Sequence, residues 1–136
     1  MAGNTAGVTM RWRERLVFEG GRAGRPPIVV DGDSAVATSP VELLLLAGAT
    51  CTSADVVSIL EKMRVGLRSL EVAVTGTRRE EYPRRFTAIR FQFSVTGLGA
   101  DETKVRRAIE LSLEKYCSVM ASLAPDIQVS YDVTIA

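Results

Sequence analysis

Two cysteines, Cys51 and Cys117, are the residues of this chain whose type could perform covalent chemistry. The thiolate is the reactive form of cysteine, and because an ordinary thiol has a pKa of about 8.5, a helix N-terminus or a nearby cation must favour ionisation. Cys117 would have such a terminus if a helix restarts there. Cysteine is also among the most buried residue types, so both could instead be small hydrophobic core residues.

The composition excludes several other kinds of chemistry. Histidine is absent, which rules out Ser-His and Cys-His catalysis and every His-ligated metal site. Two cysteines without a Cys-x-x-Cys motif do not support a structural zinc site, which collects four ligands. The 17 basic and 16 acidic residues are interspersed, so we expect neither a nucleic acid nor a membrane as partner.

The first cysteine lies in the middle of a predicted apolar helix, Ser39–Leu60. Ser39 and Glu42 form a capping-box pattern, and Pro40 suits the first helical position, where no backbone donor is needed. Gly66 is expected to supply the left-handed residue that ends the helix. The run Leu43–Leu46, followed by small residues, leaves no solvent-facing side for about three turns, so we expect a helix in the core. Cys51 lies about three turns after the start of this helix.

The whole chain of 136 residues is expected to form a single domain, with about residues 1–9 flexible. A chain of this size removes only about two-thirds of its unfolded surface from water and would struggle to cover a helix on all sides. We therefore predict a homodimer. The N-terminal residues lack the basic and apolar regions of a secretory signal, which predicts a cytoplasmic location.

The remaining pattern predicts two groups of strands and a second helix. Before the apolar helix, alternation predicts a strand over Met10–Phe18 and a short one over Pro26–Val30 that pairs back on it. After it, Leu70–Val74 and Ile89–Val95 predict an antiparallel pair with one apolar face on a helix. A helix capped by Asp101 follows, then a strand. The sequence thus predicts an α+β fold.

In that second helix, periodicity does not decide whether the helix continues through Cys117 or restarts there. The apolar positions expected on its buried side are Val105, Ala108, Ile109, Leu113 and Tyr116.

Three segments resemble the OsmC/Ohr family of osmotically induced and organic-hydroperoxide-resistance proteins. They are Ser39–Leu60, with Cys51 among small residues, then Arg84–Ile89, and Glu114–Val119 around Cys117. The similarity extends from about Trp12 to the C-terminus. Residues 55–60 and 78–81 resemble a bacterial OsmC-like subgroup of poorly defined function.

The resemblance implies an OsmC-like fold, with antiparallel sheets packed around a long buried central helix, in an intertwined homodimer with active sites at the subunit interface. It implies thiol-dependent reduction of hydroperoxides, organic ones being favoured by Leu and Val side chains near the thiol. Cys51 would be the peroxidatic and Cys117 the resolving cysteine, joined as a disulfide after a sulfenic acid forms on Cys51. No metal or organic cofactor is implied, and an external dithiol would restore the thiols.

Two features depart from the peroxidases of that family. Val41 occupies the position where they usually carry the acidic residue that partners an activating arginine. The neighbouring Glu42 could take this role or serve only as the capping-box residue. Arg22, in a Gly-Gly-Arg-x-Gly turn, could be the arginine or an ordinary exposed turn residue.

The other departure is Asp55, which lies four residues after Cys51 and so on the same helical face. Without a partner, its charge would raise the pKa of a nearby thiol. We expect Arg22 or an arginine of the other subunit to pair with Asp55, the alternative being that it reaches solvent.

Two further functions remain open from the sequence. Val41 and Asp55 motivate a homodimer that has lost peroxidase activity and binds a small apolar ligand or partner. A purely structural or stress-storage protein is the third possibility.

Overall fold

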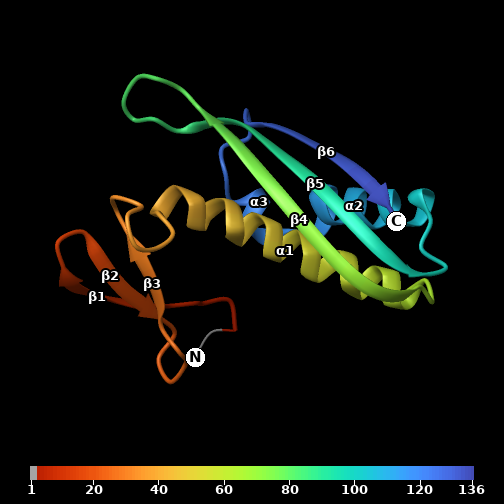
Figure 1. Ribbon diagram of the computed structural model, residues 1–136, viewed down its shortest axis with the longest axis horizontal. Helices are drawn as coiled ribbons and strands as arrows, with labels where there is room; N and C mark the ends of the chain where they lie inside the picture. Colours follow the sequence, from red (N-terminus) through yellow and green to blue (C-terminus); the bar gives the residue numbers. More distant parts are fainter. Residues whose placement is uncertain (1–2) are drawn as a thin grey trace. The chain divides into compact units, whose positions relative to one another are not determined.

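The computed structural model describes residues 3–136, and the chain divides into two compact units, one ending at Leu44 and the other running from Leu45 to Ala136. Each contains a three-stranded sheet (Figure 1). The helices and strands confirm the predicted α+β class. In chain order they are β1 (Thr9–Glu14), β2 (Val17–Gly21), β3 (Ile28–Asp31), α1 (Pro40–Lys62), β4 (Gly66–Arg78), β5 (Phe86–Leu98), α2 (Glu102–Leu111), the π-helical turn η1 (Ser112–Tyr116), α3 (Ser118–Ala121) and β6 (Gln128–Ile135).

The N-terminal sheet is an antiparallel meander in the order β1-β2-β3. The single strand predicted over Met10–Phe18 is wrong, because the chain reverses between Glu14 and Val17. Arg15 adopts the left-handed conformation there, with φ of 50°, and its carbonyl accepts a hydrogen bond from the Trp12 indole at 2.8 Å. A two-residue turn keeps apolar and polar positions in phase, so the alternation continued across it. Of the segment expected to be flexible, residues 1 and 2 lie outside the described part, and Thr9 already belongs to β1.

Helix α1 begins at the predicted capping box. The Ser39 backbone N–H donates to Glu42 Oε1 at 2.9 Å, and the Glu42 N–H donates to Ser39 Oγ at 3.2 Å. Its end differs from the prediction. Arg64, with φ of 63°, is the left-handed residue, and the Val65 N–H closes the helix on the Leu60 carbonyl at 3.0 Å. Gly66 is instead the first residue of β4.

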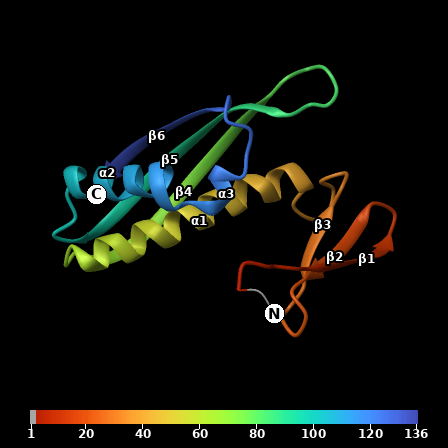
Figure 2. The same ribbon diagram turned by 180° about the vertical axis from the view of Figure 1, so that it is seen from behind.

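The C-terminal sheet has the order β4-β5-β6. Strands β4 and β5 form the predicted antiparallel hairpin, whereas β6 runs parallel to β5, so this sheet is mixed. One face of β5 is buried. From Leu45 onward, α1 lies on the same face as α2, as Figures 1 and 2 show. The core residues of this unit include Val56, Leu60, Ile89, Phe91, Phe93, Val95, Val105, Ala108 and Ile109.

Gly48 is a buried position where α1 closely approaches its neighbours. A Cβ atom added there would lie 3.0 Å from Met120 Sδ and 4.0 Å from the Phe91 ring, so a small residue lets these elements pack together. By length and composition α1 could cross a membrane, a test that core helices also pass. The helix is not covered on every side in the single chain, because Leu46 and Val57 are 55% and 41% exposed. This incomplete cover in one protomer is what was expected for a chain of this size, and the second subunit that would complete it stays a prediction.

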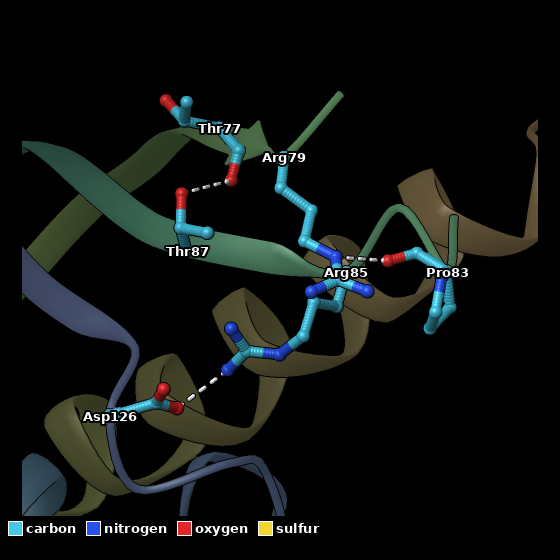
Figure 3. Close-up of polar contacts among 6 residues, drawn as sticks. All are labelled: Thr77, Arg79, Pro83, Arg85, Thr87 and Asp126. Atoms are coloured by element: carbon cyan, nitrogen blue, oxygen red, sulfur yellow. Dashed lines mark hydrogen bonds and ion pairs between the residues drawn. The ribbon is translucent and has the colours of Figure 1, made fainter. Parts of the chain in front are cut away.

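The connection between β4 and β5 is held by arginine side chains (Figure 3). Arg79 Nε donates to the Pro83 carbonyl at 2.6 Å, and Arg85 pairs with Asp126 at 2.5 Å. At the base of the loop, Thr87 Oγ1 donates to the Thr77 carbonyl at 3.2 Å. The arginines of this segment thus satisfy carbonyl and carboxylate groups of the loop and of the segment before β6.

Candidate functional site

The two cysteines meet where α1 contacts the end of α2. Cys51 lies on α1 and is half-buried, while Cys117 lies between η1 and α3 and is only 3% exposed. Both thiols are free, and Cys51 lies close enough to be one of the groups that raise the pKa of Cys117. Thr52, the residue after Cys51, donates its hydroxyl to Cys117 Sγ at 3.4 Å, so this part of α1 brings both cysteines to one place in the unit. The C-terminal unit therefore contains a thiol pair suited to dithiol–disulfide chemistry.

The π-helical turn determines how Cys117 faces α1. The Cys117 N–H donates to the Ser112 carbonyl, five residues back, at 2.8 Å. In a regular α-helix, residues five apart point about 140° away from each other, whereas an i→i+5 bond places them above one another. Ser112 and Cys117 consequently both face α1. The chain then restarts as the short helix α3 with Cys117 as its N-cap residue, which decides the question that periodicity left open.

Two fully buried hydroxyl groups connect α1 to this turn. Thr52 Oγ1 donates to Cys117 Sγ at 3.4 Å, and Ser112 Oγ donates to Asp55 Oδ2 at 2.7 Å. One donor comes from each side of the contact, and each bond joins residues more than fifty positions apart. Together they fix the register of α1 against the turn around the two sulfurs.

The groups around Cys117 have opposing effects on the pKa of its thiol. Burial raises the pKa of Cys117, because the thiolate would lose its water. The Thr52 hydroxyl opposes this rise by donating to the sulfur, and the Cys51 thiol adds to it. At neutral pH Cys117 is therefore protonated.

Asp55 has a different partner from the one predicted. In residues 3–136 its side-chain hydrogen bond comes from Ser112, and no arginine forms an ion pair with it. The carboxylate is half-buried rather than free in solvent. A neutral serine hydroxyl satisfies one oxygen but does not cancel the negative charge near the thiols.

The other two residues singled out in the sequence lie in the N-terminal unit. Glu42 is occupied as the capping residue and also accepts from Ser34 Oγ at 2.8 Å; the Ser39 backbone N–H is the main cause of its lowered pKa, with Ser34 second. Arg22 is exposed in the turn after β2, where its carbonyl accepts from the Arg25 N–H at 3.1 Å. The activating roles of Glu42 and Arg22 stay predictions.

Sequence reasoning missed Thr52 and Ser112. A signal existed for each, since Ser112 is a polar residue three positions after Ile109 on the apolar side of α2, and Thr52 precedes the buried Val56 by four. Neither position identifies its partner, because the bonds join segments distant in the sequence. The same turn corrects a third prediction: the extra residue rotates Tyr116 out of the buried face, leaving it 54% exposed.

Comparison with known proteins shows the family to which this chain belongs. The family model for OsmC-like protein matches residues 31–132. Protein YhfA of Escherichia coli K12 is 45% identical over 130 residues, which cover 93% of this chain and 97% of YhfA.

Solved structures share the fold. A hypothetical protein from Aquifex aeolicus VF5 superposes with a TM-score of 0.85 at 26% identity, covering 98% of each chain. The organic hydroperoxide resistance protein OhrB of Bacillus subtilis has a TM-score of 0.64 at 16% identity, covering 98% of this chain and 100% of OhrB. At that identity the similarity to OhrB shows the fold alone. The predicted resemblance is confirmed, and the chain belongs to the OsmC-like family.

Proposed function

We propose that this protein is a thiol-dependent peroxidase that reduces organic hydroperoxides, with Cys51 as the peroxidatic and Cys117 as the resolving cysteine. The observation that carries the proposal is that two free cysteines, one half-buried and one buried, lie near each other, with Thr52 beside Cys51 donating its hydroxyl to Cys117 Sγ at 3.4 Å. Its fold is shared with OhrB, whose name records organic hydroperoxide resistance. Family membership with this thiol pair supports redox chemistry over a purely structural role.

The difference in burial assigns the two roles. A peroxide must reach the attacking sulfur, and Cys51 is half-buried whereas Cys117 is 3% exposed. The raised pKa of Cys117 keeps it as a thiol, whose S–H can stabilise a thiolate on Cys51. This donor partly takes the place of the cation that the sequence led us to expect.

The reaction balances with peroxide and an external dithiol as its only co-reactants. The Cys51 thiolate attacks the terminal peroxide oxygen, the O–O bond breaks, and the alkoxide leaves and takes a proton, giving an alcohol and Cys51 sulfenic acid. The Cys117 sulfur then attacks the Cys51 sulfur, and the hydroxyl leaves as water to form the disulfide. A dithiol, itself oxidised to a disulfide, returns both cysteines to thiols.

A homodimer in the cytoplasm is part of this proposal. The exposed apolar side chains Leu46 and Val57 on α1 support a second subunit there, because burying them would remove apolar surface from water. A reducing compartment would keep both thiols available between turnovers.

The experiment counts thiols. One equivalent of cumene hydroperoxide, or of hydrogen peroxide, should remove two thiols from the reduced protein and give a Cys51–Cys117 disulfide by mass spectrometry. Cys51→Ser should abolish peroxide consumption, whereas Cys117→Ser should stop after one equivalent with a sulfenic acid that dimedone traps on Cys51. Retention of both thiols with either oxidant would contradict the proposal.

A second candidate function rests on a cavity in the N-terminal unit. The cavity measures about 400 Å³, and its walls are mostly apolar, including Met10, Phe18, Ile28, Val30 and Leu43. It supports binding of a small apolar ligand without peroxidase chemistry. In this case Ile28→Asp should abolish saturable binding of 1-anilinonaphthalene-8-sulfonate while Cys51→Ser leaves it unchanged.

A further inference from the structure

Thr52 is fully buried and donates its hydroxyl hydrogen to Cys117 Sγ at 3.4 Å. A buried threonine hydroxyl in a helix can usually satisfy itself on the carbonyl one turn back, as the exposed Thr50 does with the Leu46 carbonyl at 2.8 Å. Thr52 instead directs its hydrogen to a sulfur of another element. A donor aimed at a sulfur stabilises the charged form of that sulfur.

We propose that Thr52 is a positioning residue that makes Cys117 the sulfur released as a thiolate when a dithiol reopens the Cys51–Cys117 disulfide. This inference rests on the proposed function, since it concerns the step that restores the enzyme. It assigns a direction to that step, with attack at Cys51 and departure from Cys117.

The direction follows from access and from the leaving group. A thiolate of the external dithiol can reach the half-buried Cys51 sulfur but not Cys117 at 3% exposure. Attack forms a mixed disulfide with Cys51, breaks the Cys51–Cys117 bond, and leaves the electron pair on Cys117. The second sulfur of the dithiol then displaces Cys51, so that one dithiol is oxidised for each disulfide reduced.

A buried sulfur is a poor leaving group unless a donor receives its charge. The titratable groups near the pair on α1 are Cys51 itself and Asp55, whose negative charge would oppose a thiolate and is hydrogen-bonded to Ser112. Thr52 supplies an O–H to the sulfur that leaves. Threonine is also stiff about χ1, so its hydroxyl loses little freedom in making the bond.

The first test needs no peroxide. In a Cys51→Ala background, absorbance at 240 nm reports ionisation of Cys117 once the signal of the Cys51→Ala Cys117→Ala variant, which carries the same three tyrosines, is subtracted. Thr52→Val should move the pH midpoint of Cys117 up by about one unit, the effect of one hydrogen bond to a charged group. Thr52→Ser should restore it. Thr50→Val removes a hydroxyl of the same helix that bonds to the Leu46 carbonyl instead of a sulfur, and should leave the midpoint unchanged. If Thr52→Val distorts the helix, Thr52→Ala repeats the test without the added methyl group.

The second test measures the proposed step directly. Diamide, which oxidises dithiols without a peroxide, forms the disulfide. Thr52→Val should slow its reduction by dithiothreitol by up to about tenfold, because a leaving thiol whose pKa is about one unit higher departs more slowly, and Thr52→Ser should restore the rate. An unchanged midpoint or an unchanged reduction rate would overturn the role of Thr52. Failure of hydroperoxide turnover alone would overturn the proposed function while leaving both readouts of Thr52 intact.

Discussion

The two units of this chain use buried polar groups in different ways. In the N-terminal unit, Asp31 is buried and accepts backbone N–H groups from Asp33, Ala35 and Val36, all within five residues. In the C-terminal unit, the hydroxyls of Thr52 and Ser112 reach across 65 and 57 positions of sequence. Local bonds shape a loop and start a helix, whereas distant bonds set two elements in register. A site that needs two sulfurs in contact requires the second kind.

The largest loss of stability should come from truncating a core side chain in the C-terminal unit, which contains the two long-range hydrogen bonds. Phe91→Ala would empty a fully buried site beneath Gly48 and should lower the free energy of unfolding by about 3–5 kcal/mol. Urea denaturation measures this loss. Tyr82→Ala, at a side chain 87% exposed, is the matched control and should change stability little. A small loss for Phe91→Ala would mean that this unit does not depend on its packed core.

A smaller loss is expected at the distant hydrogen bond. Ser112→Ala leaves the half-buried Asp55 carboxylate without its donor and should cost about 1–3 kcal/mol in the same assay. Ser122→Ala is a suitable control, because that exposed hydroxyl bonds only to the Ser118 carbonyl of its own turn. The double variant Ser112→Ala with Asp55→Ala should lose less than the sum of the single changes. Additive losses would show that the bond contributes nothing of its own.

The local hydrogen bond at the start of α1 should contribute less to the free energy of unfolding than the Ser112–Asp55 bond. Ser39→Ala removes the side-chain acceptor of the Glu42 N–H at the start of α1 and should cost about 1 kcal/mol. Ser58→Ala, an exposed serine further along the same helix, controls for helix propensity. Equal losses for Ser39→Ala and Ser112→Ala would remove the distinction between local and distant bonds.

The smallest effect is confined to acid pH. Three backbone N–H groups, those of Asp33 and Val36 foremost, hold the pKa of Asp31 below its ordinary value of 3.8. The stabilisation from its ionised form is present above that unfolded value and is lost as pH falls through the lower folded value. Asp31→Asn should therefore flatten the decline of the thermal midpoint below about pH 4, where the ordinary carboxylate titrates. The exposed Asp33→Asn is the control, and an equal flattening there would contradict the assignment.

What the sequence predicted follows the same division. The capping box of α1, the Asp101 cap of α2 and the alternation of β4 and β5 depend on residues near one another, and the structure has all three. The errors at Arg15 and Arg64 arose because non-glycine residues take left-handed conformations, for which composition gives no warning. At the site, the two cysteines could be named from residue type and family resemblance. Their hydroxyl partners could not, because no periodicity connects a helix to a turn more than fifty residues away.

The π-helical turn also constrains how this chain can change over evolution. Glu114, Lys115 and Tyr116 are exposed within it, so core packing does not determine their side chains. The number of residues in the turn is constrained, because deleting one would restore α-helical winding and turn the Cys117 sulfur away from Cys51. The length of this turn is therefore the structural requirement, and deleting one of its residues should separate the two cysteines even where the side chain removed is exposed.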